Sequence, residues 1–184
     1  IEGQYMDMSF EKSDDVTMEQ YLDMVGRKTG ALIESAMYLG ALVATSDREQ
    51  ARGFGVCGRR LGLAFQIRDD YLGIWGDPAV TGKAVGADIR RKKKSMPVVH
   101  LFEQATPTDR TWLKELYAQE GEIAGDNVKR VLELLDRLGT PDHVQRAATD
   151  EATRALVATA DLPLSDTARE TVRAMAEFFV TREK

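Results

Sequence analysis

Apolar residues recur with a helical period along most of this 184-residue chain, and this feature constrains the fold more than any other. The pattern is clearest after Thr17 and Gln20, a pair typical of a helix start: Tyr21, Leu22, Val25, Leu32, Ile33, Leu39 and Leu42. These positions follow the ~3.6-residue turn of an α-helix. No segment alternates apolar and polar residues as a half-buried strand does. We therefore predict an all-α fold.

Capping residues, glycines and prolines predict where the helices begin and end. Ser46 with Glu49 indicates the start of a long helix that reaches Leu72. Four glycines and a proline within residues 73–86 predict a loop after that helix. Further helices are expected from about residue 97, over residues 126–138, from residue 140, and up to about residue 180.

Composition excludes several classes of protein. A hydrophobic fraction of 43% is enough for a folded core, and the formal charge of −5 argues against a protein that coats nucleic acid. The single cysteine, Cys57, rules out an internal disulfide and fits a reducing compartment. The longest apolar run, residues 31–44, is interrupted by Glu34 and Ser35, and the first residues do not resemble a signal peptide. We expect a cytoplasmic protein without stable membrane insertion.

An acidic cluster lies near the C-terminal end of the predicted long helix. Gln66, Asp69 and Asp70 stand at helical spacings that place all three on one face. Adjacent carboxylates repel each other unless a cation lies near them, and Mg²⁺ prefers oxygen ligands and often completes its shell with substrate phosphates. A solvated acidic pair is the alternative, but the neighbours Ile67 and Leu72 favour a largely buried helix.

Cations follow this cluster across the glycine-rich loop. Lys83 comes first, and the run Arg90–Lys94 comes after it. Upstream, Lys28 interrupts an apolar helical pattern within residues 26–30. Each of these features alone is compatible with a solvated surface. Together with the carboxylates they suit a pyrophosphate group, whose charge a metal and lysines neutralise from two sides.

The same residues carry a resemblance to a known family. The run FQIRDDYLGIWGDPAVTGKAVGADIRRKKKSMP, residues 65–97, resembles the second aspartate-rich region of the trans-prenyltransferases. These are the farnesyl and geranylgeranyl diphosphate synthases of the polyprenyl synthetase family. Residues 3–7 resemble the GQxxD segment of that family, and Lys28 with Thr29 resembles its KT pair. The resemblance covers roughly residues 1–102.

The resemblance implies prenyl transfer, in which an allylic diphosphate ionises and isopentenyl diphosphate adds to the cation. It implies Mg²⁺ at Asp69, with Asp70 acting as a ligand or through its water shell. Three lysines would hold the allylic diphosphate: Lys28, Lys83 and Lys93. Thr29 and Gln66 would turn side-chain oxygens toward the carbocation. Lys28, Thr29, Gln66 and Lys83 are thus the expected catalytic residues.

The chain departs from the family pattern in two ways. The second motif of the family usually reads DDxxD, whereas Gly73 stands at the fifth position here. The family's first aspartate-rich motif, its isopentenyl diphosphate site and its chain-length determinants lie upstream of the GQxxD segment. The resemblance therefore implies the C-terminal half of an isoprenoid-synthase-type bundle, with residues 1–184 as one incomplete domain. We expect exposed apolar helix faces, an N-terminal half of the same enzyme as a partner, and a homodimer.

Other interpretations of the sequence stay open. A non-catalytic subunit that binds or regulates an active partner would explain Gly73, although it has no use for the full set of lysines and carboxylates. A class I terpene cyclase ranks third, because the stretch 126–130 lacks the serine of its metal motif. A nucleic-acid module ranks last, because no aromatic residue interrupts the Arg90–Lys94 run. The C-terminal residues Arg182, Glu183 and Lys184 are expected to form a solvated tail.

Overall fold

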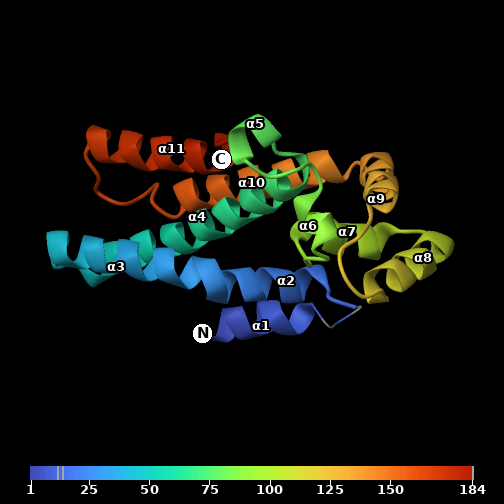
Figure 1. Ribbon diagram of the computed structural model, residues 1–184. Helices are drawn as coiled ribbons and strands as arrows, with labels where there is room; N and C mark the ends of the chain where they lie inside the picture. Colours follow the sequence, from blue (N-terminus) through green and yellow to red (C-terminus); the bar gives the residue numbers. More distant parts are fainter. Residues whose placement is uncertain (12, 14, 184) are drawn as a thin grey trace.

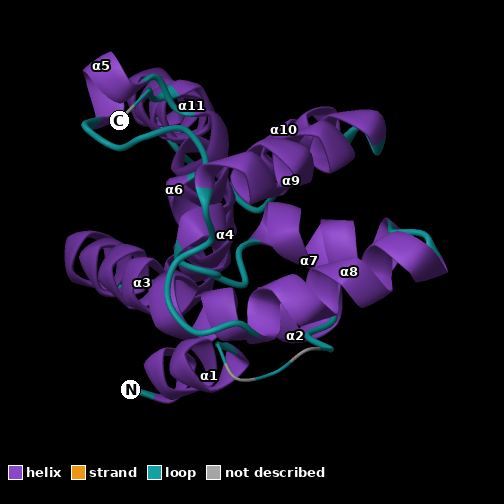
Figure 2. Cartoon of the chain, turned by 45° about the vertical axis from the view of Figure 1, so that its right-hand side comes forward, coloured by secondary structure: helices purple, strands orange, loops and turns teal. Residues whose placement is uncertain are grey.

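The computed structural model describes residues 1–11, 13 and 15–183, and every regular element within these ranges is a helix (Figures 1 and 2). The all-α prediction is confirmed. In chain order the elements are α1 (Glu2–Phe10), α2 (Met18–Val25), the π-helix η1 (Gly26–Gly30), α3 (Ala31–Thr45), α4 (Arg48–Trp75), α5 (Pro78–Thr81), α6 (Ala87–Arg90), α7 (Met96–Gln104), α8 (Pro107–Ala118), α9 (Gly125–Arg137), α10 (Thr140–Val157) and α11 (Asp166–Thr181).

The predicted helix boundaries agree with the structure in most places. Thr17 and Gln20 form the expected capping box at the start of α2. The start of α4 differs from the prediction, because Asp47 caps it by accepting hydrogen bonds from the amides of Glu49 and Gln50. Ser46 instead ends α3 in a left-handed conformation. The predicted loop over residues 73–86 also differs, since α4 extends to Trp75 and the short helix α5 follows.

The long helix α4 is the centre of the fold. It packs along α3 on one side and along α10 and α11 on the other, and η1 and α7 also contact it (Figure 1). Two glycines allow the close approach of α3 and η1. A Cβ atom at Gly58 would lie 2.7 Å from the carbonyl oxygen of Ile33, and one at Gly62 would lie 2.7 Å from the Cα atom of Gly30. A larger residue at either position would push these helices apart.

The apolar interior consists of three clusters arranged around α4. One lies between α7, α8 and α9, one between α2, α7 and α10, and one between α4, α10 and α11. Helix α4 contributes a large buried side chain to each cluster: Ile74 to the first, Ile67 to the second and Leu61 to the third. All three are at most 1% exposed. Burial of each such side chain stabilises the fold by about 1.5–3 kcal/mol. Helix α4 is therefore fixed on several sides.

Helix α3 differs from the other long helices. None of its fifteen residues, all of them described, is buried. Leu32, Leu39 and Val43 are exposed to 74%, 56% and 84%. The expectation of exposed apolar helix faces is thus confirmed for α3. Within the described residues, no helix combines the length and the apolar character that a bilayer crossing requires.

Candidate active site

The π-helix η1 carries Lys28 and Thr29 and joins α2 to α3 without a break. A π turn is wider than an α turn, and such turns are frequent at functional sites. Helix α1 packs tightly on it, because Gly3 has no side chain and a Cβ there would lie 2.6 Å from the Cα atom of Lys28. This contact brings Asp7 of α1 to the ammonium group of Lys28, with which it forms an ion pair. The GQxxD-like and KT-like segments are therefore adjacent.

Hydrogen bonds connect η1 to the acidic face of α4. The Thr29 hydroxyl donates to Oε1 of Gln66 at 3.0 Å, and Nε2 of Gln66 donates to Oδ1 of Asp70 at 3.2 Å. Gln66 and Asp70 are four residues apart on one helix and face the same way, as their spacing predicts. The amide of Gln66 thus has a donor on one side and an acceptor on the other, which fixes its orientation.

Asp70 is almost fully buried, with 1% of its surface exposed. Its Oδ1 accepts from Nε2 of Gln66 and from Nζ of Lys93, the latter at 2.8 Å. Its Oδ2 accepts from the hydroxyl of Tyr21 at 2.6 Å and from the backbone amide of Met96 at 2.9 Å. A carboxylate has about four acceptor sites, and these four donors use them. In this arrangement Asp70 offers a cation no open site, and it joins α2, α4 and the start of α7.

Lys93 lies between two carboxylates. Its ammonium contacts Oδ1 of Asp70 at 2.8 Å and Oδ2 of Asp88 at 3.2 Å. Burial by itself would lower the pKa of Lys93, but Asp70 and Asp88 outweigh burial and raise it. Burial also raises the pKa of Asp88, while Lys93 opposes that rise. The pair positions a permanently charged ammonium, 32% exposed, at the edge of a hollow.

Gly73 stands where the family pattern has a third aspartate, and the structure shows what occupies that space. A Cβ atom at Gly73 would lie 2.6 Å from Cγ of Asp88. The carboxylate of Asp88, from α6, therefore fills the volume beside Gly73. Sequence reasoning assigned no role to Asp88. The sequence signal for Asp88 was its position five residues before Lys93. In the structure the two residues are also linked through the backbone, because the amide of Lys93 donates to the carbonyl oxygen of Asp88.

Asp69 has surroundings unlike those of Asp70. Its side chain is 42% exposed, and its Oδ1 accepts from Nη2 of Arg182 at 3.1 Å. The Arg182 side chain is 8% exposed, with its guanidinium carbon 4.0 Å from the centre of the Phe65 ring. Arg68 donates to the carbonyl oxygen of Arg182 at 2.9 Å. The expectation of a solvated tail is therefore wrong for Arg182, and Lys184 lies outside the described residues.

A hollow of about 290 Å³ is lined in part by Gly73. Four carboxylates and four cations line it: Asp7, Glu11, Asp69, Asp88, Lys83, Arg91, Lys93 and Lys94. Lys83 and Lys93, both predicted diphosphate ligands, thus share one hollow with Asp69, whereas Lys28 lies behind it beside Asp7. Among the described residues, no three His, Cys, Asp or Glu side chains converge as a metal cage does. This donor set fits Mg²⁺, which binds few protein carboxylates and takes water and phosphate oxygens as its other ligands.

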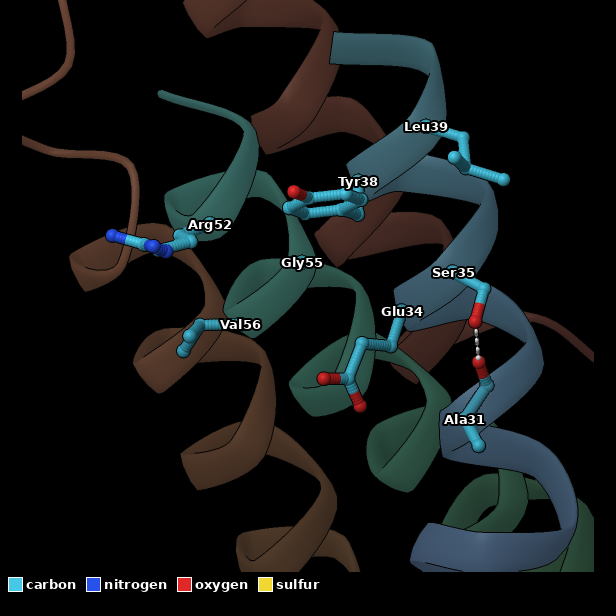
Figure 3. A pocket seen from close by; sticks show the side chains of 8 residues that line it. All are labelled: Ala31, Glu34, Ser35, Tyr38, Leu39, Arg52, Gly55 and Val56. Carbon is cyan, nitrogen blue, oxygen red and sulfur yellow. Dashed lines mark hydrogen bonds between the residues drawn. The ribbon is translucent and has the colours of Figure 1, made fainter. Parts of the chain in front are cut away.

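A larger hollow of about 590 Å³ lies between α3 and α4 (Figure 3). In Figure 3 Glu34, Tyr38 and Leu39 extend from α3, and Arg52 and Val56 extend from α4. Val56 and Asp69 are thirteen residues apart on α4, or about 20 Å along the helix axis. The hollow is therefore separate from the charged hollow around Gly73 and adjoins the exposed apolar side chains of α3.

The charged hollow, the KT-like π-helix and the all-α architecture can be compared with known proteins. A family model described as Polyprenyl synthetase matches residues 1–135. The chain belongs to the polyprenyl synthetase family. The family model ends at residue 135, but relatives of the family match the chain almost from end to end.

Similar proteins of this family are prenyl diphosphate synthases. A short chain isoprenyl diphosphate synthase of Methanothermobacter thermautotrophicus is 36% identical over 99% of this chain and 55% of its own length. A geranylfarnesyl diphosphate synthase of Aeropyrum pernix is 37% identical over 99% of this chain and 56% of its own length. This polyprenyl synthetase chain therefore spans about half the length of these curated relatives.

Solved structures of the family share the fold. The crystal structure of geranylgeranyl pyrophosphate synthetase from Pyrococcus horikoshii has a TM-score of 0.89 at 36% identity, covering 99% of this chain and 54% of that one. A polyprenyl synthase from Caulobacter crescentus, complexed with calcium and isoprenyl diphosphate, has a TM-score of 0.88 at 27% identity, covering 100% and 55%. The polyprenyl synthetase architecture thus extends over the whole described chain.

Proposed function

We propose that this chain takes part in Mg²⁺-dependent prenyl transfer, in which an allylic diphosphate and isopentenyl diphosphate condense to a short-chain prenyl diphosphate of the farnesyl or geranylgeranyl type. The observation that carries the proposal is that Asp69, Lys83 and Lys93 line the same charged hollow. The family relatives, which are prenyl diphosphate synthases, support it. A hollow that combines carboxylates with lysines suits a metal–diphosphate group, which carries charges of both signs.

In this proposal Asp69 is the carboxylate that holds Mg²⁺, because it is partly exposed and lines the hollow. Asp70 acts beside it by orienting Lys93 and Gln66, since its four acceptor sites already have donors. Lys93 and Lys83 bind the diphosphate oxygens, and Lys28 approaches from η1. When bound, the ion would stabilise the charge that develops on the departing diphosphate.

Thr29 and Gln66 are proposed to face the carbocation. Their oxygen atoms lie 3.0 Å apart, and Asp70 holds the amide of Gln66 so that its oxygen points toward Thr29. Oxygen dipoles fixed in this way stabilise a cation without having to reorient during the reaction. Met24 and Val25 of α2, both buried, lie beside Gln66 and would limit the access of water that would quench the cation.

The proposal also includes the polypeptides with which this chain associates. We propose that a segment equivalent to the other half of the relatives' length, the N-terminal half of the same enzyme, covers the exposed apolar face of α3. By family resemblance, the assembled enzyme is a cytoplasmic homodimer. The second candidate is a non-catalytic subunit, and the observation that favours it is Gly73 in place of the third aspartate of the DDxxD pattern. A rise in melting temperature with Mg²⁺ plus pyrophosphate supports a diphosphate site and disfavours a bare scaffold.

The test begins with the intact mass of every polypeptide in the purified protein, measured under denaturing conditions. Transfer of labelled isopentenyl diphosphate to an allylic diphosphate is then assayed with Mg²⁺. Asp69→Asn should lower turnover by about 10³-fold, because a metal ligand is lost. Asp150→Asn, an exposed acid on α10 with the same change of charge, is the control and should have no effect. A loss of less than about tenfold in Asp69→Asn would remove the metal assignment.

A further inference from the structure

Tyr21 lies outside every motif that the sequence analysis identified, seven residues before Lys28 on α2. Its side chain is 1% exposed, and its hydroxyl donates to Oδ2 of Asp70 at 2.6 Å across 49 residues of sequence. Burial raises the pKa of Tyr21 well above its usual value, and Asp70 adds to that rise. The phenol is therefore always a donor at physiological pH.

The carboxylate of Asp70 connects Tyr21 to the residues of the charged hollow. Two donors on Oδ2, the Tyr21 hydroxyl and the Met96 amide, hold one edge of the carboxylate. The other oxygen, Oδ1, then points to Nζ of Lys93 and Nε2 of Gln66. Without the Tyr21 hydroxyl, Oδ2 would have an open acceptor site in a buried position. With one donor left on that edge the carboxylate can turn, so that Oδ1 no longer stays opposite Nζ of Lys93 and the ammonium is held less firmly.

We propose that Tyr21 is a positioning residue, which fixes the Asp70 carboxylate and thereby places Lys93 for a diphosphate and Gln66 for Thr29. The inference rests on the proposed function for the identity of the ligand, but the placement of Lys93 is a property of the chain itself. Met96 contributes only a backbone amide, so Tyr21 is the side chain on Oδ2 that a substitution can remove.

The structure offers a matched control for a Tyr21→Phe variant. Tyr117 is also buried, 8% exposed, but its hydroxyl makes no hydrogen bond with any residue that the structure describes. Its ring stacks under the Lys94 ammonium at 4.7 Å, a contact that phenylalanine keeps. Tyr117→Phe therefore removes a buried hydroxyl of the same kind without touching Asp70.

The first experiment measures the acylation rate of Lys93 in the full, ligand-free protein by competitive labelling and mass spectrometry. Lys83, exposed on the loop, is the internal reference. In Tyr21→Phe the rate of Lys93 relative to Lys83 should rise about threefold, because the ammonium leaves its position between Asp70 and Asp88 more often. Tyr117→Phe should leave the ratio unchanged. An unchanged ratio in Tyr21→Phe overturns the inference, whether or not the protein binds a diphosphate.

The second experiment measures the dissociation constant of inorganic pyrophosphate in the presence of Mg²⁺ by calorimetry. Tyr21→Phe should weaken binding about fivefold relative to wild type and to Tyr117→Phe. The dissociation constants are compared at a temperature at which all three proteins are fully folded. Wild-type protein that binds no pyrophosphate contradicts the proposed function alone, because the labelling result still decides the placement of Lys93. Wild-type binding with equal affinity in Tyr21→Phe contradicts the positioning role alone.

A measurement on the unaltered protein covers the case in which Tyr21→Phe does not fold. A phenol that donates to a buried carboxylate exchanges its hydroxyl proton slowly and gives a separate downfield proton resonance. With tyrosine labelled selectively, Tyr21 should show this resonance with through-space contacts to Met96. The absence of the resonance at low temperature would show that the hydrogen bond is not persistent, and it would overturn the inference.

Discussion

The surroundings of Asp70 and the outer face of α3 are opposite kinds of environment within one chain. Around Asp70, a buried charge has four donors, drawn from α2, α4, α7 and the loop between α6 and α7. On α3, Leu32 and Val43 are apolar but exposed to 74% and 84%. The difference shows that the charged region completes its interactions within the chain. The face of α3 instead presents apolar surface that is typical of an interface.

The largest effect is expected when Asp70 is removed. Asp70→Ala leaves Tyr21, Lys93 and the Met96 amide without their acceptor in a buried position, and it should lower the free energy of unfolding by about 3–5 kcal/mol. Urea unfolding measures the change. Asp69→Ala, at the neighbouring exposed carboxylate, should cost less than about 1 kcal/mol. Similar losses for the two variants would contradict the contrast between these adjacent residues.

A smaller effect is expected at the contact between Arg182 and Asp69. Arg182→Gln removes the cation that occupies Asp69, so the affinity of the metal-free protein for Mg²⁺ or Mn²⁺ should increase about threefold. Titration calorimetry or Mn²⁺ resonance measures it. Arg169→Gln is the control, because Arg169 on α11 has the same charge and donates to the carbonyl oxygens of Ala160 and Leu162 rather than to a carboxylate of the hollow. Equal affinities in both variants would mean that Arg182 does not compete with the ion.

The smallest effect is expected on α3. Leu39→Ser and Val43→Ser should each change the free energy of unfolding of this chain by less than about 0.5 kcal/mol, because their side chains already contact water. Leu61→Ala on the neighbouring helix should cost about 2–5 kcal/mol. The oligomeric state of each variant, measured by sedimentation velocity, shows whether the α3 face forms an interface with another polypeptide. A loss above about 2 kcal/mol in the serine variants would show that this face is already packed in solution.

Local patterns in the sequence predicted the helices, the shared face of Gln66 and Asp70, and the cations of the loop. They could not separate the two aspartates, because adjacent residues on a helix differ by about 100° and only the packing of α2 and α7 decides which one is buried. The contact of Tyr21 with Asp70 spans 49 residues, and that of Arg182 with Asp69 spans 113. Periodicity contains no information at such separations. The π turn at Lys28 likewise depends on the packing of Gly3 and Gly62 against it.

The close approach of Asp88 to Gly73 couples two positions that lie fifteen residues apart. A mutation that writes the common DDxxD motif into this chain would insert a second carboxylate where the Asp88 side chain lies, so the Asp88 carboxylate and its contact with Lys93 would have to shift. Residues 73 and 88 are thus coupled through space, and through Asp88 a change at residue 73 reaches the ammonium group of Lys93.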